Sequence, residues 1–375
     1  VDTAAQTIRE AYAAMVPAKV AYGTAVPDDH PERGLCNVAL DGRDPFILIE
    51  TITTVRFIDA ADDSTIAVLV NWGGHPESAG DKNHSISSDY PHYLRQGVES
   101  GIHRGSTDLE GVGGIAMFMD GAFGSQIGHP LAVTCEDLEG ETWEPTSWDD
   151  FMPEFGKVQC IGENLAVAVL RAIENETEPA DECPLAFRVL QFEVTVENYG
   201  FHALILNDVL HLHNREVRYD RTRFLTGDNL PKFDTEISWV RIGESQAINV
   251  PGELTPELAV GGYDGSRTPA CAYDRGIDRD LLSYPDNPNL PDLTQAPGPP
   301  YLFDFLDDLG AVYPMVWGTT NDFLGYIIPS YNYKLAEAGA YIEQADGDHY
   351  EETNSLGPGA WPQMQRYFEG ILLFR

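Results

Sequence analysis

The amino-acid sequence predicts a mixed α/β fold in which helices enclose β-sheets. Runs rich in β-branched and aromatic residues, typical of strands, alternate along the chain with segments whose apolar residues recur every three to four positions, typical of helices. Hydrophobic residues make up 43% of the 375 residues, which is enough for a packed core. The length would allow two domains, but no shift in composition marks a boundary, so we expect a single domain over residues 1–375.

The first predicted element is a helix over residues 4–16, because Ile8, Tyr12 and Val16 share one helical face. Further helical periodicity predicts helices over residues 91–100, 161–175 and 301–309. Strand-like runs occur at Ile47–Ile58, Thr65–Trp72, Ile115–Met119, Leu185–Val196, Ile237–Val250 and Val312–Trp317. This interleaving of strands and helices favours an α/β sandwich over an all-β barrel.

Residues 263–300 form a predicted loop insertion, since they carry seven prolines among Asp and Asn residues. A loop of this length in a compact domain is either a lid over a binding site or an irregular surface segment. If it is a lid, its tyrosines Tyr273, Tyr284 and Tyr301 should face the site.

The charge of the chain excludes one class of function. The 60 Asp and Glu residues outnumber the 23 Lys and Arg residues, which gives a net charge of −37. Such a chain does not bind the phosphate backbone of nucleic acids. The longest apolar runs, such as Ile66–Val70 and Ile371–Phe374, are far shorter than a membrane-spanning helix requires.

The five cysteines and the first residue indicate in which cellular compartment the protein is expected. No CxxC pair occurs, which argues against zinc knuckles and thioredoxin-like sites, and at most two disulfides can form. Val1 is not an initiator methionine, so we expect an upstream segment such as a signal peptide, a propeptide or part of the domain. We therefore expect a secreted, periplasmic or cell-surface protein.

Four predicted strands run into a glycine-containing segment and then deliver a polar residue. The segments are VLVNWGGHP, MFMDGAFG, INVPGE and VWGTTNDFLGY, and the residues are His75, Asp120, Glu253, Asn321, Asp322 and Tyr326. Strand ends in α/β folds line ligand crevices, and glycine allows close approach of a backbone or substrate. The four strand ends are therefore predicted to form one site.

His75 and Glu253 are candidate metal ligands. His75 precedes Pro76, which favours extended backbone and directs the imidazole from the strand end. Glu253 opens a short helical pattern. Zinc binds both residue types and, in hydrolases, keeps a position open for water. The alternatives are a hydrogen-bonded loop histidine and a carboxylate that complements a helix dipole.

Two loop segments offer supporting residues. NHSISSDYP carries His84 and Asp89, and Asp89 either caps the helix that begins near Pro91 or orients a metal-bound histidine. GDHYEETNSLGPG carries Tyr350 among carboxylates that in such loops are usually only solvated. Ser125 lies in AFGSQ, which lacks the GxSxG pattern, so a serine hydrolase that uses Ser125 is a weaker alternative.

Six segments in order, NWGGHPES, NHSISSDYPHYL, FMDGAFGSQIGHP, VPGELTPELAVGG, GTTNDFLGYIIP and HYEETNSLGP, resemble the catalytic domain of the neutral/alkaline (non-lysosomal) ceramidase family. The resemblance implies an amide-hydrolysing site with one zinc ion bound by two histidines, a glutamate and a tyrosine. His75, Glu253 and Tyr326 match three of these ligands. Tyr350 matches a tyrosine that contacts substrate.

The chain departs from the family pattern at three places. The other zinc histidine lies in an HTHS-type motif that falls upstream of Val1, so we expect the site to be completed by a missing N-terminal segment or a partner chain. The family's active-site serine falls on Phe123, and Ser125 replaces an aspartate. The family's asparagine–arginine pair reads Asn37-Val38. The immunoglobulin-like C-terminal domain of long members is not expected within residues 1–375.

The leading hypothesis is an exported zinc-dependent hydrolase that cleaves an amide bond in a small or lipid-like N-acyl substrate with metal-activated water. His75, Glu253 and Tyr326 would bind the zinc ion, and Tyr326 would also contact the reacting oxygen. Tyr350 would orient the substrate beside a pocket formed at Asp120 and Gly121. Supporting positions around the ligands are assigned to His84, Asp89 and Asn321. The alternative to catalysis is a binding or accessory protein with a degenerate metal site.

Overall fold

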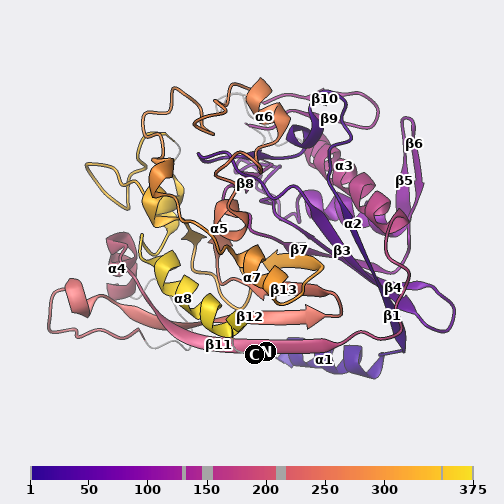
Figure 1. The fold of residues 1–375 in the computed structure, drawn as a ribbon, viewed down its shortest axis with the longest axis horizontal. Coiled ribbons are helices and arrows are strands. Elements are labelled where there is room, and N and C mark those ends of the chain that lie inside the picture. The colour runs from indigo at the N-terminus through magenta and orange to yellow at the C-terminus, as the bar shows by residue number, and fades with distance from the viewer. Residues whose placement is uncertain (1, 129–131, 146–154, 208–216, 348, 374–375) are drawn as a thin grey trace.

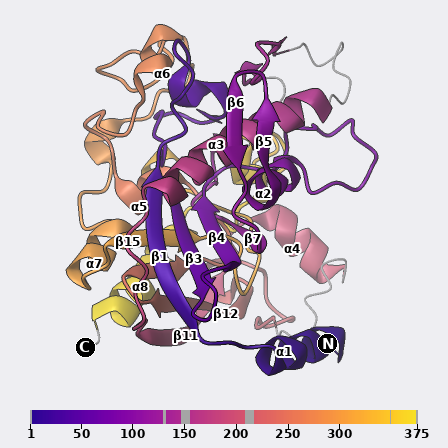
Figure 2. The ribbon, with the colours of Figure 1, turned by 90° about the vertical axis from the view of Figure 1, so that its right-hand side faces the viewer.

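The chain is a mixed α/β protein, as its sequence predicts (Figure 1). The computed structural model describes residues 2–128, 132–145, 155–207, 217–347 and 349–373. Two four-stranded sheets carry the fold, and long helices pack on each of them (Figure 2). Among the described residues, no helix combines the length and the apolar character needed to cross a membrane.

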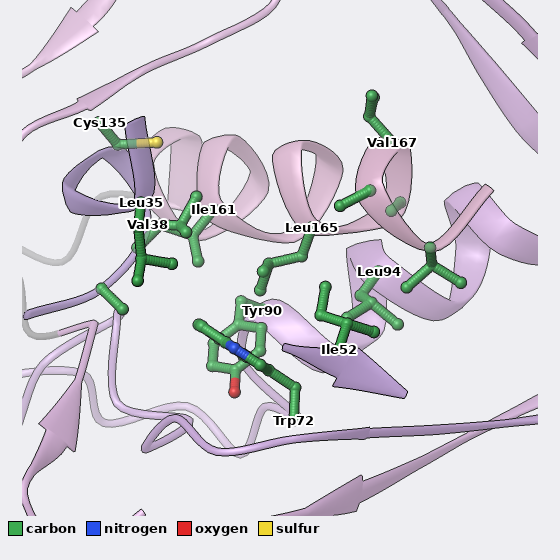
Figure 3. Close-up of a cluster of buried hydrophobic side chains, with 14 of the residues drawn as sticks. Leu35, Val38, Ile52, Trp72, Tyr90, Leu94, Cys135, Ile161, Leu165 and Val167 are labelled. Carbon is green, nitrogen blue, oxygen red and sulfur yellow. The ribbon is translucent and has the colours of Figure 1, made fainter. Parts of the chain in front are cut away.

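The first sheet has the strand order β1 (Ala18–Ala25), β3 (Ile52–Asp59), β4 (Thr65–Trp72) and β7 (Ile115–Asp120). The first three strands are antiparallel, and β7 joins β4 in parallel. Helices α2 (Tyr90–Ser100) and α3 (Phe155–Glu174) pack on one face of this sheet. Trp72, Tyr90 and Leu165 lie at the centre of this core (Figure 3).

The second sheet has the order β11 (Leu185–Thr195), β12 (Lys232–Ile242), β13 (Ser245–Asn249) and β15 (Tyr313–Trp317). Only β13 and β15 pair in parallel. Helices α7 (Leu302–Asp308) and α8 (Ala360–Leu373) pack on it and enclose a second apolar core.

The two sheets face each other. Successive side chains of a strand point to opposite faces of its sheet, so each sheet contributes one face to the layer between them. In β13, Ile248 packs in the helix-covered core, while its neighbour Ala247 belongs to a small cluster shared with residues of the first sheet. Across this layer Tyr22 stacks on Tyr313 at 5.1 Å, and the Asn71 side-chain amide donates to the Val316 carbonyl at 2.8 Å. The result is a sandwich of helix, sheet, sheet and helix layers.

The remaining elements are short and lie mostly at the rims of the two sheets. The paired strands are β2 (Leu40–Asp41) with β8 (Gln126–Ile127), β5 (Gly101–Arg104) with β6 (Thr107–Glu110), β9 (Cys135–Glu136) with β10 (Thr142–Trp143), and β14 (Glu253–Leu254) with β16 (Tyr326–Ile327). The remaining helices are α1 (Asp2–Ala13), α4 (Tyr199–Leu206), α5 (Pro256–Val260) and α6 (Ala270–Asp274). Single 3-10 turns occupy Gly34–Asn37, Gly227–Asn229, Leu293–Gln295, Ser330–Asn332 and Glu351–Asn354.

Two strand predictions differ from the structure in their limits. The run Ile47–Ile58 becomes a strand only at Ile52, because the backbone before it pairs with the loop of residues 263–300: Leu48 N–H donates to the Arg267 carbonyl at 3.0 Å. The run Ile237–Val250 is two strands, since the chain turns at Gly243, where φ is 60°. Strand β1 and helices α4 and α8 were not predicted from the sequence.

Two disulfides form, the maximum expected from five cysteines. Cys36 pairs with Cys271 and Cys135 with Cys160, while Cys183 remains a free thiol. The first bond ties the loop of residues 263–300 to the 3-10 turn that contains Cys36. This loop is therefore anchored to the body of the protein.

Candidate active site

His75, Glu253 and Tyr326 meet at one point of the fold. Strands β14 and β16 pair in parallel with Glu253 opposite Tyr326, which places the two side chains next to each other. His75 follows β4 and is fixed by its backbone N–H, which donates to the Gln126 carbonyl at 3.0 Å. Its Nε2 lies 2.7 Å from Glu253 Oε2 and 3.4 Å from the Tyr326 hydroxyl oxygen. The three strand ends therefore form one cluster.

Asp120 fixes the backbone that leads to His75. Its carboxylate accepts hydrogen bonds from the backbone N–H groups of Gly74 at 3.0 Å and of Gly121 at 3.1 Å. Burial raises the pKa of Asp120 to about 8 despite these two donors. A Cβ atom on Gly121 would lie 2.9 Å from the Gly73 nitrogen, so this crossing of two strand ends requires a residue without a side chain. The glycine pattern of the sequence thus has a steric cause.

The cluster stabilises the protonated form of His75. Burial lowers the pKa of His75, but the hydrogen bond to Glu253 and the nearby carboxylates of Glu77 and Asp120 outweigh it and raise the pKa to about 9. Burial, together with the charges of Glu253 and Glu351, raises the pKa of Tyr326, which is therefore a neutral phenol at neutral pH. At neutral pH the site therefore holds a protonated imidazole that is hydrogen-bonded to Glu253, beside a neutral phenol.

An imidazole nitrogen, a carboxylate oxygen and a phenol oxygen converge here from three chain segments. The first two are established zinc ligand types, and the phenol oxygen can complete an oxygen-rich set. Among the residues that the structure describes, no group of three or more His, Cys, Asp or Glu side chains is arranged to bind a metal. At this point of the fold the described residues therefore offer three donors to a zinc ion: His75 Nε2, a Glu253 carboxylate oxygen and the Tyr326 hydroxyl oxygen. Because a metal binds neutral imidazole, it would replace the proton of His75.

A mostly apolar cavity of about 310 Å³ adjoins this cluster. Its walls include Glu253, Tyr326 and Tyr350 together with aliphatic and aromatic side chains, among them Val196, Phe201, Ile205, Phe233, Phe323, Leu324 and Leu356. Tyr350 is 51% exposed, and its ring stands edge-on to the ring of Tyr326 with centroids 5.9 Å apart. Glu253 and Tyr326 of the polar cluster therefore lie in one wall of a recess that suits an apolar group, and His75 contacts them from behind that wall.

Comparisons with known proteins agree with this architecture. The structure superposes on a neutral ceramidase from Pseudomonas aeruginosa with a TM-score of 0.56 and 14% sequence identity, over 98% of this chain and 54% of that chain. A second solved structure, a ceramidase complexed with C2, gives a TM-score of 0.56 and 15% identity over 97% and 54% of the two chains. The chain has the fold of the neutral ceramidases. It spans about half the length of these two proteins.

No protein-family model and no curated protein sequence matches the chain. The likeness to the ceramidases therefore lies in the fold, at a level of identity that carries no residue roles by itself.

Three expected supporting residues lie outside the cluster. Asp89 caps helix α2 and accepts hydrogen bonds from the backbone N–H groups of Ser78 and Ala79 at 3.0 and 2.8 Å. It thereby holds the turn after His75 without contacting the imidazole. His84 is exposed. The Asn321 amide donates to Ser238 Oγ at 3.2 Å, so this side chain is directed to β12.

Ser125 lacks the partner that a serine nucleophile requires. It is buried, and its hydroxyl contacts the carboxyl of Asp41. Within the described part of the chain, no histidine forms a hydrogen bond with Ser125, so a general base is missing. The neighbouring Phe123 instead packs its ring edge-on against His75 with centroids 4.7 Å apart. It limits the space around the imidazole.

The loop of residues 263–300 does not cover the cavity as a lid would. None of the described residues that line the cavity comes from this loop. The Tyr273 ring lies under the Arg279 guanidinium, and the Tyr301 hydroxyl donates to the Pro297 carbonyl at 2.8 Å. Tyr284 packs against the first core. Of the two alternatives that the sequence left open, these contacts do not support the lid, because the segment is itself part of the packed structure.

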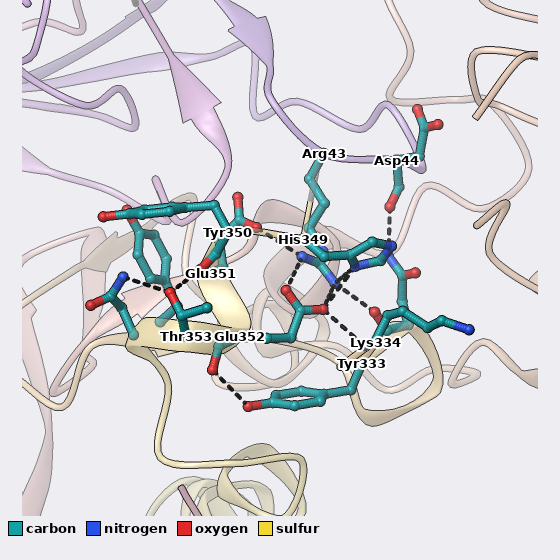
Figure 4. A network of polar contacts seen from close by, with 12 residues as sticks. Arg43, Asp44, Tyr333, Lys334, His349, Tyr350, Glu351, Glu352 and Thr353 are labelled. Atoms are coloured by element: carbon teal, nitrogen blue, oxygen red, sulfur yellow. Dashed lines mark hydrogen bonds and ion pairs between the residues drawn. The ribbon is translucent and has the colours of Figure 1, made fainter. Parts of the chain in front are cut away.

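A buried polar network lies behind the site and was not predicted from the sequence. Arg43 lies at its centre and contacts Glu351, Glu352 and His349 (Figure 4). Arg43 stands in the segment DGRDP, just after β2, and matches no motif. The sequence offers no local signal for it, because Arg43 is one of 18 arginines and its acidic partners lie more than 300 residues away.

Proposed function

We propose that this chain is a zinc-dependent hydrolase that cleaves an N-acyl amide bond. One observation carries the proposal: His75 contacts Glu253 and Tyr326, and these last two side chains line an apolar cavity. The fold shared with neutral ceramidases supports the same reaction class. Those two structures are of ceramidases, and amide hydrolysis is extended to this chain as part of the proposal.

His75, Glu253 and Tyr326 would hold the zinc ion, and a histidine upstream of Val1 would complete the ligand set. When bound, zinc polarises a carbonyl group and lowers the pKa of water toward ~7. His75 must lose its Nε2 proton to bind, and the Glu253 carboxylate is placed to balance the charge. The neutral Tyr326 hydroxyl can donate a hydrogen bond to the oxygen on which negative charge develops.

The remaining residues orient the substrate and the ligands. Asp120 holds the glycine backbone before His75, and Phe123 packs on the imidazole. Tyr350, at the cavity wall beside Tyr326, is placed to contact the substrate next to the amide. The apolar part of the cavity suits an acyl group, so the substrate class is a small or lipid-like N-acyl amide.

We place the protein outside the cytoplasm, because its two disulfides are stable only in an oxidising compartment. The acidic excess of 60 carboxylates over 23 basic residues would keep such an exported protein in solution.

The proposal is tested with the natural full-length protein. Its zinc content is measured by mass spectrometry after dialysis, and hydrolysis is followed with N-acyl amides of increasing chain length. We expect about one zinc per chain, loss of hydrolysis with a chelator and recovery with zinc. Hydrolysis that survives full removal of the metal would contradict the proposal. Zinc binding without turnover of any N-acyl amide would favour the non-catalytic alternative, and fluorophosphonate labelling of Ser125 would favour a serine hydrolase.

A further inference from the structure

Arg43 is the centre of a buried ion-pair network that holds one short turn of the chain. The turn consists of residues 349–352. Arg43 donates to Glu351 Oε2 at 2.8 Å and to the two carboxylate oxygens of Glu352 at 2.7 and 3.0 Å. Its Nη2 also lies 3.3 Å from His349 Nδ1. One guanidinium thus contacts three of the four residues of the turn.

Tyr350 is the one residue of this turn that Arg43 does not contact, and its side chain points in another direction. Figure 4 shows its ring on the side of the turn away from Arg43, and the ring lies in the wall of the cavity. Residues on both sides of Tyr350 are therefore fixed in the interior, while its own side chain is half exposed. The position of the ring follows from the position of its neighbours.

The network fixes geometry more firmly than a surface ion pair would. Arg43 is 3% exposed and Glu352 is 1% exposed, so water does not compete for these hydrogen bonds. A planar guanidinium that binds a carboxylate through two nitrogens defines both distance and orientation. Arg43 also donates to the Asn332 carbonyl at 2.5 Å, and the Asn332 amide donates to the Asp44 carbonyl at 2.6 Å. The turn is thereby joined to the segment that carries Arg43.

We infer that Arg43 is a positioning residue, which acts through the turn of residues 349–352 to hold the Tyr350 ring at the cavity beside Tyr326. The kinetic consequence rests on the proposed function, whereas the effect on the turn does not. Arg43 itself lines a different cavity, so it acts on substrate only through Tyr350.

The test compares Arg43→Lys, Tyr350→Ala and the double variant. Lysine keeps the charge and loses the two-nitrogen contact with Glu352. We expect faster amide hydrogen exchange in residues 349–354 of Arg43→Lys, unchanged zinc content, and a fall in kcat/KM of about 10²-fold, the size of effect that misplacement of a substrate-orienting group can cause. In the Tyr350→Ala background, Arg43→Lys should lower kcat/KM less than about twofold, because the residue it positions is already absent.

Arg56→Lys is the matched control, because Arg56 forms an ion pair with Glu176 at the first sheet, away from the turn. It should change neither exchange in residues 349–354 nor kcat/KM. Unchanged exchange of these residues in Arg43→Lys, or losses that multiply in the double variant, would overturn the inference. If Arg43→Lys does not fold, the variant Arg43→Met, Glu351→Gln, Glu352→Gln, which removes the guanidinium together with both carboxylates it contacts, takes its place with the same readouts.

The proposed hydrolase function and the positioning role of Arg43 can be refuted independently of each other. If the natural protein hydrolyses no N-acyl amide, the proposed function fails, and hydrogen exchange alone decides the inference. Faster exchange confined to residues 349–354 then supports it, and unchanged exchange overturns it.

Discussion

Glu253 Oε2 lies 2.7 Å from His75 Nε2, although 178 residues separate the two in sequence. The contact joins the end of a strand in the first sheet to a two-residue strand that leads out of the second. It therefore forms only when both sheets are in place. Several expected outcomes depend on this pair and on the network behind it.

Replacing His75 by alanine should remove zinc binding and leave the fold intact. The imidazole packs mainly on Phe123 and bonds to Glu253, so its loss should cost about 2 kcal/mol of the free energy of unfolding. Metal content and a thermal melt of the same sample measure both effects. His103→Ala, at an exposed histidine paired with Asp108, is the control and should change neither. An unfolded variant with unchanged zinc content would make His75 a purely structural residue.

Zinc affinity should rise with pH. The pKa of His75 in the metal-free protein is raised to about 9, so zinc must displace one proton below that pH. We expect the apparent affinity to increase about tenfold per pH unit between pH 7 and 8, measured by competition with a chromogenic chelator. A pH-independent affinity in this range would show that His75 does not bind the metal.

The stability of the metal-free protein should change with pH in the opposite sense. The folded pKa of His75 lies above the unfolded value of about 6.5, so its contribution is complete below pH 6.5 and is lost as pH rises through about 9. Urea unfolding at pH 6, 7.5 and 9 in the presence of a chelator measures this slope. The His75→Ala variant should have a smaller slope over the same interval, and an equal slope would assign the effect to other groups.

Glu352 should contribute to stability at acid pH. Burial disfavours its charge, but the hydrogen bond with His349 and the charge of Arg43 outweigh burial and lower the pKa of Glu352 to about 2. Its folded pKa is depressed, so the contribution is present above the unfolded value of about 4.5 and is lost as pH falls toward 2. Glu352→Gln should destabilise the protein by about 3 kcal/mol at pH 7 and by less at pH 3, because it leaves Arg43 short of a partner. Equal destabilisation at both pH values in urea unfolding would contradict this.

The two disulfides should differ in their effect on stability. Cys36–Cys271 closes a separation of 235 residues, and Cys135–Cys160 closes one of 25. By the chain-entropy estimate, their loss costs about 5 and about 3 kcal/mol respectively. Double Cys→Ser variants compared by urea unfolding test the order. The reverse order would show that residual structure in the unfolded chain outweighs loop length.

Local sequence patterns were enough to predict most strands of the two sheets. Strands β4, β7, β11 and β15 were recognised because runs rich in β-branched and aromatic residues are a property of neighbouring positions. Strand β1 was missed, since small residues such as Ala18, Ala21 and Gly23 dilute that signal. Gly23 is required there because a Cβ atom would lie 2.2 Å from the Ala172 carbonyl oxygen of α3. This contact between distant residues cannot be predicted from the sequence around Gly23.

The candidate site was predicted in part. The strand-end pattern selected His75, Glu253 and Tyr326, and the structure brings these together. It does not bring His84 or Asn321 to them, because adjacency to a motif in sequence does not fix the direction of a side chain. Arg43 was missed altogether, since its partners Glu351 and Glu352 lie 308 and 309 residues away.

The sequence by itself thus determined the α/β class, the strong acidic excess, the upper limit of two disulfides and the residue types at the strand ends. These depend on composition and on periodicity over a few residues. Only the tertiary structure decided which cysteines pair, that residues 263–300 are anchored in the body of the protein, and that Arg43 lies behind the turn of Tyr350. Such features depend on contacts between distant segments, and one sequence specifies these only through the packing of the whole chain.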